Sequence, residues 1–150
     1  MKTAFAVVAL IVITSSGCSI VTGYHRDWNS PCCCANRCDV AGCWQGSWNS
    51  DCTRHEGNLK AIITQEDACH YEARFRGTFF KVIPFQYRMT LTAVQHGDHY
   101  HLSGEKDLGR MLGVYRFRGY STPRDFVAYY SSKDDQGKFL MSRRTLQGAK

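Results

Sequence analysis

The chain has 150 residues, of which 43% are hydrophobic and 21% charged, and its formal net charge is +6 at neutral pH. Its basic residues are scattered and form no run of the kind found in nucleic-acid-binding arms, so we expect no specific nucleic-acid partner. A mildly basic surface of this kind suits anionic lipids or polysaccharides.

The first residues have the pattern of a secretory signal. Lys2 is followed by about ten apolar residues at 4–13 and then by the small-residue stretch "TSSGCS". A spanning helix needs about 20 apolar residues, so this segment is too short to anchor the chain by itself. We interpret residues 1–17 as a signal peptide; the alternative is a buried N-terminal helix or strand.

The end of this segment, "SSGC", resembles the lipobox of bacterial lipoproteins, although Ser15 stands where Leu, Val or Ile is usual. The resemblance implies acylation of Cys18 and attachment to the membrane through N-terminal acyl chains. Ser19 as the second mature residue implies the outer membrane. Ordinary cleavage, which would leave a periplasmic or secreted protein, is the alternative.

Residues 18–41 contain many Ser, Asn, Gly and Cys residues and show no sustained periodicity. We predict an irregular, cysteine-rich tether that docks on the following domain.

From residue 42 onward, apolar and polar side chains alternate with a period of two, the signature of strands with one buried face. The clearest case is "CHYEARFRG", where Tyr71, Ala73 and Phe75 face opposite to Arg74 and Arg76. Eight strands are expected, at residues 42–50, 57–65, 69–77, 83–94, 100–104, 111–119, 125–132 and 138–143.

Eight sequential antiparallel strands tend to close, because closure removes exposed edges. We therefore predict an all-β fold, an antiparallel up-and-down barrel or a strongly curled sheet, over residues 42–144. A cysteine-rich irregular segment precedes it, and residues 145–150 form a tail.

"GCW" and "GSW" in the first strand, with Arg143 and Arg144 in the last, resemble the calycin pattern of lipocalins, fatty-acid-binding proteins and avidins. The resemblance implies that Trp44 or Trp48 lies at the closed end of the barrel beneath one of these arginines as a cation–π pair. The long helix that follows a lipocalin barrel is missing. The "GxWxGxW" opening is also similar to that of uncharacterised bacterial envelope proteins, which implies no activity.

Export would place the cysteines in an oxidising compartment, where disulfides are the default in a small domain. We expect a Cys52–Cys69 bridge that would staple neighbouring parts of the sheet. If Cys18 is acylated, seven cysteines remain, so at least one is unpaired, metal-bound or joined to another chain. Binding of a soft metal by the cysteine-rich segment is the alternative. The candidates for disulfides are Cys32, Cys33, Cys34, Cys38, Cys43, Cys52 and Cys69.

The sequence "HGDHYH" places His96, Asp98, His99 and His101 around a hairpin turn. His99 and His101 share one strand face, so both imidazoles could reach one metal ion. The alternative is a polar hairpin with solvated histidines. His55 and His70, which neighbour Cys52 and Cys69, would meet only if disulfide pairing brought them together.

No activated nucleophile, paired catalytic carboxylates or glycine-rich phosphate loop is recognisable, so we expect a non-enzymatic protein without a cofactor. Two functions fit this pattern. One is a binding module that holds a small apolar or anionic ligand in the barrel, if Ala61, Ala73 and Gly113 leave a cavity. The other is a structural or interaction component of the envelope with a filled barrel. Arginines on the strands could contact an anionic envelope polymer or simply form a solvated outer face.

Overall fold

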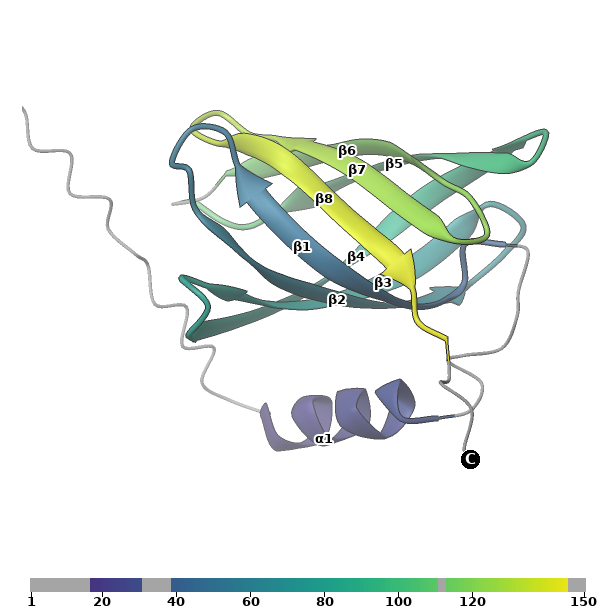
Figure 1. Ribbon diagram of the computed structural model, residues 1–150, viewed down its shortest axis with the longest axis horizontal. Coiled ribbons are helices and arrows are strands. Elements are labelled where there is room, and N and C mark those ends of the chain that lie inside the picture. Colours follow the sequence, from purple (N-terminus) through teal and green to yellow (C-terminus); the bar gives the residue numbers. More distant parts are fainter. Residues whose placement is uncertain (1–16, 31–38, 111–112, 146–150) are drawn as a thin grey trace, which may run out of the picture.

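The computed structural model describes residues 17–30, 39–110 and 113–145. This part of the chain contains one helix and eight strands (Figure 1). They are α1 (Gly17–Trp28), β1 (Gly42–Ser50), β2 (Glu56–Gln65), β3 (His70–Phe79), β4 (Ile83–His96), β5 (His99–Asp107), β6 (Val114–Ser121), β7 (Asp125–Ser131) and β8 (Gln136–Arg143). Each strand pairs antiparallel with the next, and β8 pairs with β1. The predicted eight-stranded up-and-down barrel is confirmed.

The alternation of the sequence decides which side chains enter the barrel. In β3, Tyr71, Ala73 and Phe75 are buried, whereas the residues between them are half-buried on the outer wall. Aromatic rings fill the space across the interior. Phe139 lies 5.6 Å from Phe75 and 5.3 Å from Tyr130, measured between ring centroids. The inward-facing side chains therefore form the core.

Glycines in β1 and β6 let the strands curl tightly enough to close. A Cβ added to Gly46 would lie 2.0 Å from the carbonyl oxygen of Leu140, and one added to Gly119 would lie 2.0 Å from that of Val127. These distances are shorter than real Cβ atoms show. At these two positions the neighbouring strand therefore lies too close for any side chain.

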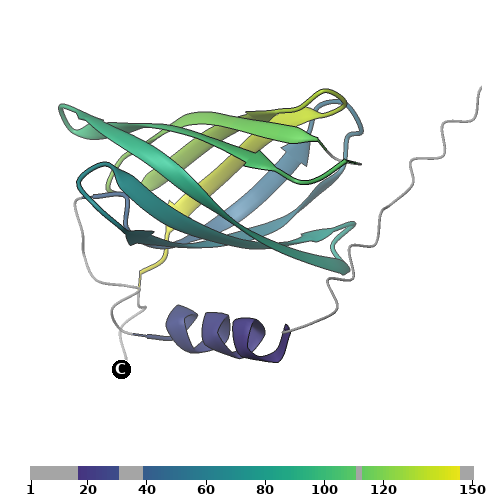
Figure 2. The same cartoon turned by 180° about the vertical axis from the view of Figure 1, so that it is seen from behind.

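The segment that we predicted to be an irregular tether begins with α1, which lies along the outside of the barrel (Figures 1 and 2). Tyr24 and Trp28 are one helical turn apart, and their stacked rings pack with Cys43 and Ile62 of the barrel wall. The Asp27 carboxylate accepts a hydrogen bond of 2.8 Å from Arg74. The sequence pattern does not locate this helix, because two aromatic residues alone carry its apolar face.

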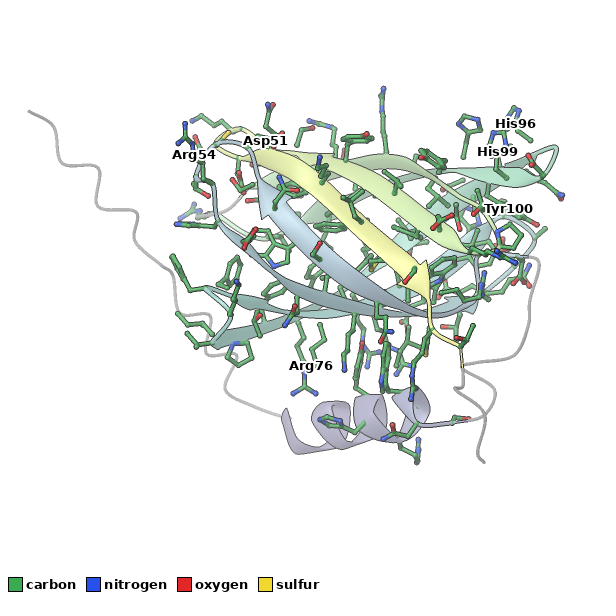
Figure 3. All side chains as sticks on the ribbon, viewed as in Figure 1. Asp51, Arg54, Arg76, His96, His99 and Tyr100 are labelled. Carbon is green, nitrogen blue, oxygen red and sulfur yellow. The ribbon has the colours of Figure 1, made fainter. Side chains whose placement is uncertain are left out.

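The two ends of the barrel differ in what they carry. The turns after β1, β3, β5 and β7 lie at one end, which Asp51 and Arg54 mark in Figure 3. The turns after β2, β4 and β6 lie at the other, which His96 and His99 mark. Among the described residues, no helix is long and apolar enough to cross a bilayer.

Residues 1–16, 31–38, 111–112 and 146–150 lie outside the described part of the chain. Nearly all of the predicted signal peptide and of the C-terminal tail, together with the cysteines at 32, 33, 34 and 38, therefore fall there. Cys18 lies within α1, at its second residue.

Candidate functional site

One end of the barrel is closed by a tryptophan and an arginine from its first and last strands. Trp44 pairs with Arg143 across the β1–β8 seam, and the Arg143 guanidinium carbon lies 4.2 Å from the centroid of the Trp44 ring. Trp44 is fully buried, and its indole donates a hydrogen bond of 3.0 Å to the Val40 carbonyl oxygen. This is a cation–π contact at the seam where the barrel closes.

Arg143 also connects three chain segments. It donates hydrogen bonds to the carbonyl oxygens of Pro123 and Ala41, both at 2.6 Å, and to that of Asp39 at 2.5 Å. A guanidinium offers five donors in a fixed fork, so one side chain can satisfy several carbonyl groups. The β6–β7 turn and the chain leading into β1 are thereby held to the end of β8.

The other two residues expected at the closure lie elsewhere. Trp48 is near the opposite end of the interior, where its ring centroid lies 5.1 Å from that of Phe79. Its indole N–H donates a hydrogen bond to the Thr78 carbonyl oxygen. The Arg144 guanidinium lies 5.0 Å from the ring centroid of Trp28 in α1. The structure thus brings together Trp44 and Arg143 within the barrel, while Arg144 holds the helix.

These features define an eight-stranded antiparallel barrel with an aromatic interior and an arginine across one end. No family model and no curated protein matches the chain. The chain is similar in fold to a solved structure described as the de novo design of a fluorescence-activating β-barrel, with 18% sequence identity and a TM-score of 0.50. The match covers 71% of this chain and 94% of the designed one.

The depressions that described residues form on the outer wall of the barrel include a larger and a smaller one. The larger has a volume of about 550 Å³. A row of paired residues, Tyr120, Val127 and Leu140, lines it from β6, β7 and β8. The smaller, of about 290 Å³, lies beside Glu72 and Arg88.

Of the inward positions expected to leave room for a ligand, Ala61 and Ala73 are buried within the filled core. Gly113 lies outside the strands, in the loop before β6, so its predicted inward position is wrong.

Three histidines gather at the tip of the β4–β5 hairpin. His96 pairs directly with His99, and His101 follows on the same face of β5. The ring centroids are 4.6 Å apart for His96 and His101, 5.1 Å for His99 and His101, and 6.5 Å for His96 and His99. Figure 3 shows His96 and His99 at the end of the barrel, on its outside.

Asp98 in the same turn contacts one of the three rings. Its Oδ1 lies 3.0 Å from Nδ1 of His99. This hydrogen bond is the main reason why the pKa of the Asp98 carboxyl is lowered. All four residues singled out in "HGDHYH" therefore lie at one tip, with Asp98 directed to His99.

A second group of ligand-type side chains occupies the β2–β3 turn. Asp67, Cys69 and His70 place a carboxylate oxygen, a sulfur and a ring nitrogen within 4.8 Å of one another. The backbone N–H of Cys69, the ring of His70 and the backbone N–H of His70, in that order, lower the pKa of Asp67 to about 2. The sequence pattern does not single out Asp67, because nothing in it shows where this carboxylate points.

The expected Cys52–Cys69 bridge is wrong, since both residues carry free thiols. Cys52 follows β1 and Cys69 precedes β3, so the length of β2 separates them at opposite ends of the barrel. His55 and His70 are kept apart for the same reason. Cys43 is fully buried under α1 and is not one of the free thiols of the described residues.

Proposed function

We propose that this chain is an exported, membrane-anchored and non-enzymatic barrel that acts as a structural or interaction component of the cell envelope. The observation that carries the proposal is the filled interior. Phe75, Phe117 and Tyr130 surround Phe139 with ring centroids 5.3–5.7 Å away. Side chains that pack this densely leave the outer wall as the surface for recognition.

The larger outer depression supports a role in protein or polymer contact. Tyr120 and Leu140, on its lining, are each 43% exposed, and Tyr129 on the same wall is 57% exposed. Exposed aromatic and aliphatic side chains of this kind are enriched at interaction sites.

The position of α1 supports attachment at one end of the barrel. Nε2 of His25 lies 2.7 Å from a guanidinium nitrogen of Arg76, whose side chain points toward the helix in Figure 3. Cys18 lies six residues before Tyr24 and Phe80 four residues after Arg76. At about 1.5 Å per helical residue and 3.3 Å per strand residue, Cys18 and the β3–β4 turn extend about 9 and 13 Å in the same direction.

The turn at that end is apolar and exposed. Phe79, Phe80 and Val82 are 37, 47 and 74% exposed, and Lys81 lies among them. Apolar side chains next to a basic one suit the interface of an anionic bilayer. An acyl chain on Cys18 and this turn would therefore meet the same membrane surface.

Fractionation of the native cell envelope tests the anchoring. We expect the chain in the membrane fraction with the mass of an acylated Cys18 N-terminus, and a Cys18→Ser variant in the aqueous fraction. An unacylated chain that is found only in the aqueous fraction would contradict the anchor.

A ligand-binding barrel is the second candidate, favoured by the fold likeness to a design described as fluorescence-activating. Native intact mass of the protein from its own envelope separates the two functions. Extra mass that is lost on denaturation would favour the binding module. A mass equal to the processed chain, with acyl groups and any hydrogens lost to disulfides, would favour the filled structural barrel.

The cysteine-rich segment fits this proposal as a staple. Cys43 lies against Tyr24 and Trp28 of α1, and four cysteines at 32–38 precede it in the chain. A disulfide from Cys43 to one of them would tie the chain after α1 to β1. Peptide mapping without reduction would identify the partner.

A further inference from the structure

The β4–β5 hairpin places three imidazole side chains on the same outer face of its tip. Gly97 begins the two-residue turn with a φ of 63°, the backbone that type II′ hairpin turns use at this position. Because the turn has only two residues, His96 and His99 become direct cross-strand neighbours. His101 lies two residues further along β5 and so points to the same side.

The ring centroids are near the spacing of a metal site, but the ligand nitrogens of the three rings do not yet all lie within 4.8 Å of one another, so the rings must rotate to bind one ion. A histidine nitrogen binds zinc at about 2.0–2.1 Å, which puts each ring centroid about 3.2 Å from the ion and two centroids about 4.5–5.3 Å apart. The pairs His96–His101 and His99–His101 already fall in this range, at 4.6 and 5.1 Å. The pair His96–His99, at 6.5 Å, must close by about 1 Å. Rotation of the exposed His96 side chain can supply that movement.

Asp98 orients one of the ligands. Its contact with Nδ1 of His99 favours a proton on that nitrogen and leaves Nε2 to face a metal. Metal-binding histidines commonly have such a carboxylate on the second ring nitrogen, which fixes the ring and makes it a better ligand.

We propose that His96, His99 and His101 form a surface site for a divalent transition metal of the kind that imidazole prefers, namely Zn²⁺, Cu²⁺ or Ni²⁺. Asp98 is a positioning residue for His99. The residues that pair with His101 on the two neighbouring strands are Val94 and Tyr120, neither of which is a carboxylate or an amine. The remaining coordination positions are open to water or to a group on another molecule. This site is independent of the membrane anchor and of the filled interior.

The Asp67, Cys69 and His70 group is the competing site. Its ligand atoms already lie within 4.8 Å of one another, but its carboxylate is engaged in the turn. Oδ1 of Asp67 already accepts hydrogen bonds from the backbone N–H groups of Cys69 and His70. Both carboxylate oxygens also lie within 2.9 Å of Nδ1 of His70. A metal there would have to break the contacts that form the turn.

Calorimetric titration of the untagged mature chain with Ni²⁺, after treatment with a chelator, tests the proposal. We expect one site with micromolar affinity. His96→Asn, His99→Asn and His101→Asn should each weaken binding at least tenfold, and Asp98→Asn should weaken it about tenfold. The matched control is His55→Asn, which changes a histidine at the opposite end of the barrel and should leave the affinity within twofold.

Two further measurements exclude misfolding of the variants and metal binding by cysteine. Far-ultraviolet circular dichroism of each variant must equal that of the parent, which we expect because the three side chains lie on the outer surface. Cu²⁺ bound to the parent should give an electron paramagnetic resonance spectrum with nitrogen hyperfine lines and no thiolate charge-transfer band. No binding, or binding that survives the three histidine changes, whether it resides at Cys69 and His70 or in the cysteine-rich segment, would overturn the proposal.

Discussion

Arg143 covers the ring of Trp44 and also donates hydrogen bonds to the carbonyl oxygens of Asp39, Ala41 and Pro123. One side chain near the end of β8 therefore connects the seam of the barrel, the entry into β1 and the β6–β7 turn. The closure of this barrel depends on these contacts, because Trp44 and Arg143 come from the two strands that are furthest apart in the sequence.

Arg143→Met should destabilise the protein by about 3 kcal/mol, because hydrogen bonds to charged groups are worth about 1.5–3 kcal/mol each and the thioether keeps only part of the packing. Urea unfolding measures the change. Arg118→Met, an exposed position on the outer wall of β6, should change stability by less than about 0.5 kcal/mol. Equal effects of the two changes would contradict a special role for Arg143.

Gly46→Ala should lower the free energy of unfolding by at least about 2 kcal/mol, because the added methyl group meets backbone atoms of β8 that cannot move aside without opening the seam. The matched change is Gly23→Ala in α1, where the added Cβ has no atom within 4 Å apart from its chain neighbours and the helix's own backbone. There we expect a gain of up to about 1 kcal/mol from helix propensity. Thermal unfolding of both variants is the measurement, and a tolerated Gly46→Ala would show that the strands need not approach so closely.

Lys81→Gly should stabilise the protein by about 1 kcal/mol. Lys81 has a φ of 64°, a conformation that costs an L-residue about 1–2 kcal/mol, and its contact with Glu56 is exposed and contributes little. Lys133→Gly is the control, because this exposed turn residue is not among the residues with positive φ and glycine there should destabilise. Chemical denaturation compares the two, and a loss of stability in Lys81→Gly would argue against backbone strain at this turn.

The β3–β4 turn should contact bilayers even without an acyl chain. In a Cys18→Ser background, a Phe80→Ser and Val82→Ser double variant should bind anionic vesicles about tenfold more weakly, because less apolar surface is buried in the interface. Val94→Ser removes a side chain that is 50% exposed on β4 and should have little effect. Vesicle sedimentation measures the binding. A turn variant that binds as well as its parent would exclude this contact while leaving acylation at Cys18 open.

The docking of α1 should weaken in acid. The hydrogen bond from Arg74 is the main cause of the lowered pKa of Asp27. A carboxyl whose pKa is depressed on folding stabilises the fold above its unfolded pKa, and that contribution disappears as the pH falls through the folded pKa, which here lies below 3.8. The protection factors of the α1 amide groups against hydrogen exchange, which correct for the intrinsic pH dependence of exchange, should therefore fall below pH 4.

Carboxyl-carbon NMR separates this effect from other titrations. In Arg74→Met the midpoint of Asp27 should rise toward the ordinary value, while that of Asp67, which its own turn lowers, should stay near 2. An unchanged Asp27 midpoint would contradict the role given to Arg74.

The sequence alone determined the barrel, because strand alternation is a local property and eight antiparallel strands have a strong tendency to close. It also indicated the histidine tip, since a two-residue turn places its flanking residues side by side without help from the rest of the fold. Only a resemblance predicted a tryptophan, Trp44 or Trp48, and an arginine at the closure.

Tertiary structure decided the rest. Cys52 and Cys69 looked close because they flank one strand, but that strand's length separates them in space. The docking of α1 depends on Tyr24 and Trp28 meeting Ile62 on the wall of β2, and the choice of Arg143 rather than Arg144 depends on the register of β8 against β1. Contacts between distant segments depend on the register of paired strands and on which face of each strand is covered. The alternation of apolar and polar residues along one strand shows neither.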